Sequence, residues 1–405
     1  MPVLTRERHD VPSTAAVSTR TRLESIDLLR GVVMILMALD HTRDFFGTGA
    51  SPTNPATATV VLFFTRWVTH LCAPSFFLLT GAGAYLARHR RSTKELSWWL
   101  FTRGVWLIVL ELTVVRCLGY QLNFEYRVTM LVILWALGWA MITLAALVHL
   151  PMPAIAAFGI VLIASHNLFD SVTASSLGAF APVWNILHAP GVIVSTPRYV
   201  VFVAYPIVPW IGVTALGYAL GQVFSWAPER RQAFLLRLGV ALTLAFVILR
   251  FANLYGDPIP WTSQQSGMRT VLSFLNTTKY PPSLLYLLMT LGPAVLILWM
   301  VDKGTPRLLR PTLVFGRVPL FYFLLHLPLI HLFALIVCYF RYGDVHWMFE
   351  SARLEQFPMV RPPGWGYSLP VVYVAWISVV LALYPLCQWF GGLKRRRSDA
   401  WLSYL

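Results

Sequence analysis

The stretch Ser25-Ile-Asp-Leu-Leu-Arg-Gly-Val-Val-Met-Ile-Leu-Met-Ala-Leu-Asp-His-Thr-Arg-Asp44 places an uncharged run between two charged ends. Ser25 is a good helix N-cap, and Asp27 falls in the first turn, where the helix dipole favours a carboxylate. The residues from Gly31 to Leu39 carry no polar side chain. This pattern predicts a helix over Ile26–Phe46 that enters a lipid bilayer.

One face of this predicted helix carries a cation near one end and an imidazole near the other. Arg30 and His41 are eleven residues apart, close to three helical turns, so both point the same way about 16 Å apart along the axis. An extended acyl-CoA has a matching layout, with phosphates at one end and the thioester at the other. Asp40 and Asp44 are close enough along the helix to orient the imidazole of His41 as a general base. A simpler interpretation is an ion pair at one helix end and a hydrated opposite end without chemistry.

The rest of the chain repeats the apolar pattern of the first helix. Of 405 residues, 57% are hydrophobic and only 12% are charged, a composition that a bilayer accommodates and a soluble fold does not. We predict an all-α bundle of about ten transmembrane helices, the other nine at Thr57–Ala87, Ser97–Val115, Val128–Val148, Pro151–Phe169, Tyr199–Phe224, Phe234–Tyr255, Ser283–Val301, Arg317–Phe340 and Leu369–Gly391.

The distribution of lysine and arginine orients this bundle. With the N-terminus in the cytoplasm, the inner segments hold eighteen of the 32 basic residues and the longer outer segments hold eleven. The positive-inside rule therefore places both termini in the cytoplasm. The domains expected are a disordered tail at residues 1–24, a membrane domain at 25–392 and a basic tail at 393–405.

The net charge of +15 fits this orientation and attraction to anionic membrane lipids better than nucleic-acid binding, for which no motif is present. The four cysteines are scattered without the spacing of a metal site, and no metal is expected. Phosphate-binding glycine loops, zinc-protease motifs and nucleophile elbows are missing from the sequence. The soluble enzyme classes that depend on those motifs are therefore excluded.

Several further polar residues fall inside the predicted helices or beside them. His70 and His326 lie near helix centres and are either buried packing residues or catalytic groups. Arg103 and Arg317 lie near the cytoplasmic ends of their helices, where they either join Arg30 in a phosphate site or extend to lipid headgroups. Outside the membrane, aromatic, amide and charged side chains suit a sugar acceptor or an ordinary aromatic belt, and the residues expected to bind it are Asp257, Trp261, Lys279 and Tyr280.

Four segments resemble bacterial membrane proteins related to heparan-α-glucosaminide N-acetyltransferase. They are Ser25–Gly31 with Asp40-His41, Thr69–Pro74, Thr278–Ser283 and Pro319–His326. The first segment is also similar to the wider group of integral membrane acyltransferases, which share an arginine, ten residues and a histidine. The resemblance implies a multi-pass protein of the bacterial cytoplasmic membrane that uses acetyl-CoA or another acyl-CoA.

The sequence departs from the lysosomal enzyme at one informative position. That enzyme has asparagine where this chain has His41, and its proposed catalytic histidine follows in the first outer loop. Residues Phe45 to Ala56 contain no histidine, so His41 matches the broader acyltransferase pattern instead. This difference separates the chain from strict acetyl-glucosaminide specificity.

The leading hypothesis is a membrane acyltransferase that moves an acyl group from cytoplasmic acyl-CoA to a hydroxyl or amine of an extracytoplasmic glycan or glycolipid. His41 acts as general base or forms an acyl-histidine, Asp40, Asp44 and His70 complete the catalytic group, and His326 belongs to the acceptor site. The alternatives are a transporter or flippase without covalent chemistry and a structural membrane protein. Acceptor, acyl chain and oligomeric state, a homo-oligomer included, stay open.

Overall fold

The computed structural model describes residues 18–49, 51–54, 58–397 and 399–404. Most of the predicted N-terminal tail lies outside these residues, and α1 (Ser18–Phe46) begins within the last seven residues of that tail. Eight helical segments of the described chain are long and apolar enough to cross a membrane, and α5 is a shorter apolar helix. The prediction of an all-α, multi-pass helix bundle is confirmed.

The helices follow the predicted segments in order, although several of their bounds differ. After α1 they are α2 (Val60–Thr69), α3 (Cys72–Arg88), α4 (Thr93–Leu110), η1 (Glu111–Tyr120), α5 (Ile133–Leu147), α6 (Met152–Ser165), η2 (His166–Phe169), η3 (Ala174–Phe180), α7 (Ala181–Leu187), α8 (Ile207–Gly221), η4 (Gln222–Ser225), α9 (Pro228–Ala252), α10 (Gly267–Leu275), α11 (Leu284–Asp302), η5 (Arg307–Thr312), α12 (Leu313–Gly316), α13 (Pro319–Tyr342), η6 (His346–Phe349), η7 (Leu354–Gln356), α14 (Leu369–Arg396) and η8 (Ala400–Tyr404).

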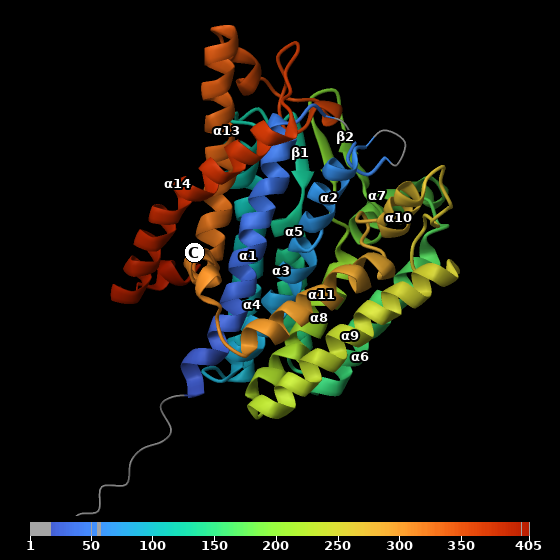
Figure 1. Cartoon of the computed structure of the whole chain (residues 1–405), viewed down its shortest axis with the longest axis vertical. Helices are drawn as coiled ribbons and strands as arrows, with labels where there is room; N and C mark the ends of the chain where they lie inside the picture. Colours follow the sequence, from blue (N-terminus) through green and yellow to red (C-terminus); the bar gives the residue numbers. More distant parts are fainter. Residues whose placement is uncertain (1–17, 50, 55–57, 398, 405) are drawn as a thin grey trace, which may run out of the picture.

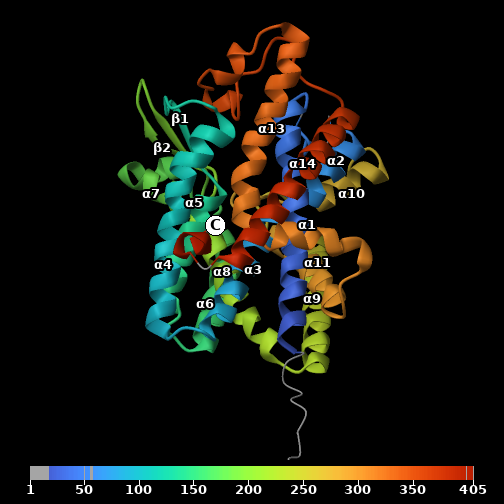
Figure 2. The same cartoon turned by 90° about the vertical axis from the view of Figure 1, so that its left-hand side faces the viewer.

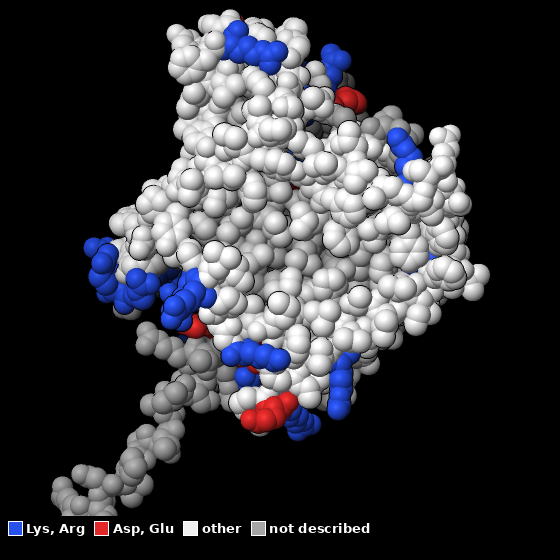
Figure 3. Space-filling view, viewed as in Figure 1, with Lys and Arg blue, Asp and Glu red and all other residues white. Residues whose placement is uncertain are grey.

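Helix α1 is the central element of this bundle. It contacts α2, α3, α11, α12, α13 and α14, while α4 packs on α5 and α9 packs on the side of α11 (Figures 1 and 2). Helix α8 joins the two sides because it packs against α3, α5 and α6. The face in Figure 3 has charged side chains near its ends and a broad uncharged region across its middle, as a bilayer-spanning protein requires.

Two predicted helix starts are wrong, because Val128–Leu131 and Val200–Val203 form strands β1 and β3. Together with β2 (Gly191–Ser195) they make a sheet of order β1-β3-β2, in which β1 and β3 are parallel and β2 and β3 antiparallel. Val200–Val203 holds three valines, and Val128–Leu131 begins with valine and threonine, β-branched residues that favour a strand when a partner can pair its backbone. Val128 lies opposite Val200, so two segments far apart in sequence pair their backbone N–H and C=O groups.

The second predicted helix, Thr57–Ala87, is broken at His70 and Leu71 into α2 and α3. The cause is Pro74, which has no N–H to donate to the carbonyl oxygen of His70 four residues earlier. The hydroxyl of Tyr286 on α11 donates to that carbonyl oxygen at 2.9 Å instead. The break is therefore a stabilised feature that redirects the chain beside α1.

Glycines let α1 and α12 approach so closely that their backbones are in contact. A methyl group added at Gly31 would overlap the carbonyl oxygen of Thr312, and one added at Gly316 would overlap that of Asp27. The same contact holds the Arg30 side chain, because its guanidinium donates to the carbonyl oxygen of Gly316 at 3.2 Å and to Asp27 Oδ1 at 3.1 Å. The contact thus fixes the height of Arg30 in the bundle.

Candidate functional site

The first candidate site is a cavity of about 800 Å³ at the C-terminal end of α1, which we call the His41 cavity. Its wall comes from α1, the α2–α3 break, η1, the ends of β1 and β3, the loop before α11 and the loop before α14. The polar residues that line it are Asp40, His41, Arg43, Asp44, Thr48, Ser51, Thr59, Arg66, Thr69, Tyr120, Tyr205, Lys279, Tyr280, Arg361, Tyr367 and Ser368. It therefore gathers side chains from nearly the whole length of the chain.

Asp40 is the electrostatic centre of the His41 cavity. Its Oδ1 lies 2.9 Å from the guanidinium of Arg43, and its Oδ2 forms an ion pair with Arg66 on α2. The ammonium of Lys279 lies 3.9 Å from the same Oδ2. Three cations from three segments thus converge on one carboxylate, which keeps Asp40 ionised and fixes the positions of Arg66 and Lys279 in the cavity wall.

His41 lies beside this cluster with its ring among other aromatic groups. The ring centroid is 5.1 Å from that of His326 on α13 and 6.0 Å from that of Tyr120 at the end of η1. The carboxylate of Asp44 accepts a hydrogen bond from the guanidinium of Arg43 at 2.8 Å, and the backbone carbonyl oxygen of Asp44 accepts one from Arg361. The imidazole is consequently positioned by packing, with the two carboxylates near it held by arginines.

His326 and His70, also predicted from the sequence, do not line the cavity wall. His326 is fully buried behind His41, and its Nδ1 lies 2.6 Å from the carbonyl oxygen of Phe323. His70 is buried at the α2–α3 break with its ring against Tyr286, at a centroid distance of 5.4 Å. Both histidines support elements of the site from behind.

Of the four outer-loop residues predicted to bind the acceptor, two line the His41 cavity and two do not. Lys279 and Tyr280 line the His41 cavity, whereas Asp257 and Trp261 do not. Asp257 is buried and accepts hydrogen bonds from the hydroxyl of Ser283 at 2.6 Å and the backbone N–H of Thr278 at 2.8 Å. Those bonds hold the loop that presents Lys279 to the cavity.

Two groups in the loops of the His41 cavity have shifted pKa values. Burial acts to raise the pKa of Tyr280, but the nearby Lys279 and Arg66 charges outweigh it and lower that pKa below its ordinary value. Burial lowers the pKa of Arg361, which the Asp44 carboxylate partly opposes. The cations beside Tyr280 therefore favour a negative charge at that position of the cavity wall.

A second cavity of about 360 Å³ lies toward the N-terminal end of α1, and we call it the Arg30 cavity. Arg30 and Arg103 line it together with the aromatic rings of Trp99, Trp106 and Tyr404. The guanidinium of Arg103 lies over the Trp99 ring at 4.3 Å and over the Tyr404 ring at 5.1 Å. The remainder of the wall is almost entirely aliphatic or aromatic.

Arg317 does not join this pair. Its side chain is nearly half exposed, pairs with Glu24 at 3.8 Å and lies outside the wall of the Arg30 cavity. Arg30 and Arg103 thus line one cavity, as the phosphate-site alternative requires, and Arg317 does not line it. Arg317 lies in the turn between α12 and α13.

The comparison with protein families agrees with this arrangement. Residues 22–250 match the family model described as heparan-alpha-glucosaminide N-acetyltransferase, catalytic, which covers more than half of the chain. The chain belongs to this family. A search of curated proteins finds no match.

The matched region of this acetyltransferase family runs from α1 to near the end of α9. It includes Arg30, Asp40, His41 and Arg103, and it ends before Lys279 and His326. The family places the chain among the membrane acyltransferases. Among the described residues, no group of three or more His, Cys, Asp or Glu side chains could hold a metal ion.

Several polar residues that line the His41 cavity were not predicted as site residues, Arg66 and Tyr120 among them. Arg66 could have been found from the sequence, because an arginine within an apolar segment is a functional candidate by itself. Tyr120 had no local signal, because it reaches His41 through the wide π-helical turn of η1.

Proposed function

We propose that the protein transfers an acyl group, in the simplest case acetyl, from cytoplasmic acyl-CoA to an amine or hydroxyl of an extracytoplasmic glycan or glycolipid. The observation that carries the proposal is the pair of cavities along α1. Arg30 and Arg103 line one, and His41 lines the other. Donor and acceptor therefore have separate entrances from opposite ends of the same helix.

In the Arg30 cavity, the two arginines bind the phosphates of the donor. Guanidinium groups pair with phosphate oxygens through charge-assisted hydrogen bonds, and the Trp99 and Tyr404 rings offer stacking surfaces. The apolar wall beyond them suits the pantetheine arm and the thioester. Arg317, which pairs with Glu24 outside this wall, has no part in the proposed donor site.

In the His41 cavity, the acceptor approaches the imidazole. A lone pair on the acceptor nitrogen or oxygen attacks the thioester carbonyl carbon while His41 takes the acceptor proton. The carbon–sulfur bond then breaks, its electrons go to sulfur, and the thiolate of CoA receives the proton from His41. Asp40 holds the Arg66 and Lys279 cations beside the oxyanion that develops on the carbonyl oxygen.

The substitution His41→Gln tests the assignment, because glutamine keeps hydrogen bonding but cannot act as a base at this position. We expect acyl transfer to fall by about 10²- to 10⁴-fold. Thermal stabilisation of the purified protein by acetyl-CoA should persist, since His41 does not line the Arg30 cavity.

The readout is mass spectrometry of surface glycans and lipids from cells that carry the wild-type gene, the His41→Gln gene or no gene. Modified products should appear only with the wild type. Equal modification with the His41→Gln protein would contradict the mechanism. Stabilisation by an ion or small solute, with none by CoA species, would instead support a transporter.

A further inference from the structure

The two cavities are separated by a wall to which Phe76 and Ile133 both contribute. These two residues line the His41 cavity and also line the Arg30 cavity. Phe76 lies near the start of α3, and Ile133 is the first residue of α5. The wall therefore stands where three helices, α1, α3 and α5, meet.

This wall is only one layer of side chains thick. On α1, Met34 lines the Arg30 cavity and Met37 lines the His41 cavity, and three helical residues span about 4.5 Å. On α3, Ala73 lines the His41 cavity and Leu79 lines the Arg30 cavity, with Phe76 between them. A single ring thus occupies the level at which the two spaces would otherwise join.

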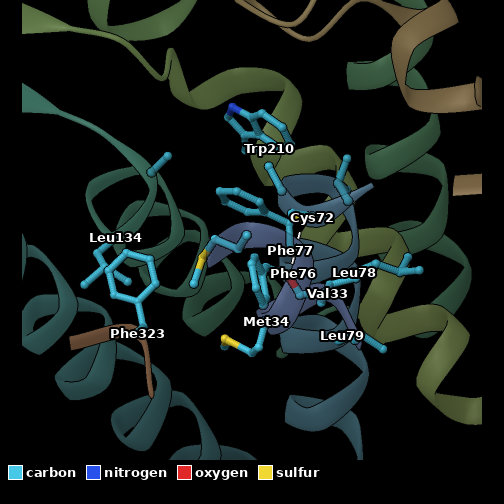
Figure 4. Close-up of a cluster of buried hydrophobic side chains, with 14 of the residues drawn as sticks. Val33, Met34, Cys72, Phe76, Phe77, Leu78, Leu79, Leu134, Trp210 and Phe323 are labelled. Carbon is cyan, nitrogen blue, oxygen red and sulfur yellow. Dashed lines mark hydrogen bonds between the residues drawn. The ribbon is translucent and has the colours of Figure 1, made fainter. Parts of the chain in front are cut away.

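The residues at this level are apolar. Figure 4 shows Phe76 beside Met34 and Cys72 within the buried cluster, with Leu134 and Phe323 nearby. The side chain of Phe76 is buried, and its neighbours in the wall carry no charge. An apolar constriction of this kind excludes water.

Ile133 is the fixed half of the wall. The carboxylate of Glu111 accepts from the backbone N–H of Leu134 at 2.8 Å and from that of Trp135 at 3.3 Å. These bonds cap the first turn of α5 and hold Ile133 in place. Phe76 is the part of the wall that can move, because its ring can leave this position by a rotation of the side chain.

We propose that Phe76 is a gate between donor and acceptor, an inference that rests on the proposed function. A donor held by Arg30 can reach His41 only past this ring, because His41 lines only the far cavity. With the ring closed, water in the His41 cavity is kept from the thioester. Otherwise a water oxygen would bond to the carbonyl carbon and the carbon–sulfur bond would break, giving a carboxylic acid and the free thiol of CoA.

The test is the release of CoA from acetyl-CoA by purified protein without an acceptor, measured by mass spectrometry. We expect Phe76→Ala to increase this hydrolysis on the order of tenfold over wild type. Phe76→Leu, which is more conservative for folding, should give a smaller increase. Phe77→Ala is the matched control, because Phe77 is a buried ring next to Phe76 in α3 but lines neither cavity.

The outcomes separate the gate from the function on which it rests. If acetyl-CoA stabilises wild type and both Phe76 variants but hydrolysis stays at the wild-type rate, the gate is contradicted and the proposed function stands. An equal increase in Phe77→Ala would also overturn the gate. If acetyl-CoA stabilises none of these proteins, the proposed function fails and the gate fails with it.

Discussion

Arg30, Arg103 and Arg317 occupy similar places in the sequence, near the ends of apolar segments, but they have different surroundings. Arg30 and Arg103 line one cavity, and Arg317 pairs with Glu24 at its own helix end. The sequence shows the charge of each arginine and its place along an apolar segment, but it does not show which side chains line one cavity. Arg317 lies in the turn between α12 and α13, where it pairs with Glu24.

The difference predicts a matched pair of substitutions. Arg103→Leu should weaken acetyl-CoA binding about tenfold, because one phosphate contact is lost, whereas Arg317→Leu should leave binding nearly unchanged. Thermal shift in detergent over a range of acetyl-CoA concentrations measures both.

Acetyl-pantetheine, which lacks the phosphates, serves as the second ligand in this comparison. The Arg103→Leu substitution should leave its binding unaltered. A loss of affinity for acetyl-pantetheine as large as that for acetyl-CoA would show that Arg103 supports the fold and does not contact phosphate.

In the His41 cavity, the sequence predicts the neighbours that share a helix but not those that a loop or an irregular turn brings in. Asp40, His41 and Asp44 are adjacent on one helix, so their proximity follows from helical spacing alone. Lys279 was predicted for the acceptor, yet its approach to Asp40 depends on a loop that Asp257 holds. Tyr120 depends on a π-helical turn, for which the sequence pattern offers no sign.

At the scale of elements, apolar segment length predicted ten helical segments in the right order. The errors fall where tertiary partners override local pattern. Val128–Leu131 and Val200–Val203 read as helix starts because they are apolar, but each becomes a strand once the other supplies its hydrogen bonds. The break before Pro74 is stable because Tyr286 satisfies the freed carbonyl oxygen of His70.

The contact between α1 and α12 gives the prediction at this scale. Gly31→Ala should lower the free energy of unfolding by about 1–3 kcal/mol, since the added methyl group overlaps the Thr312 carbonyl oxygen. Gly267→Ala is the control, because a methyl group there meets nothing within 4 Å. Thermal unfolding in detergent measures both, and equal melting temperatures for the two variants would contradict the close contact.

At the scale of the whole molecule, the proposal depends on an orientation that comes from the charge distribution alone. The basic excess predicts a cytoplasmic N-terminus, and with that orientation Arg30 lies on the cytoplasmic side and His41 on the outer side of α1. The two cavities lie along α1, one lined by Arg30 and the other by His41. In the proposed reaction, the donor enters the first cavity from the cytoplasm and the acceptor enters the second from outside.

The most direct test of this account uses inverted membrane vesicles, whose outer surface is the cytoplasmic face. Radiolabelled acetyl-CoA, which does not cross the membrane, is added outside, and label is then sought in glycans and glycolipids of the vesicle lumen. The account predicts lumenal label with the wild-type protein and at least a hundredfold less, to order of magnitude, with His41→Gln. Equal lumenal label in both vesicle preparations, or label only on the cytoplasmic face, would contradict it.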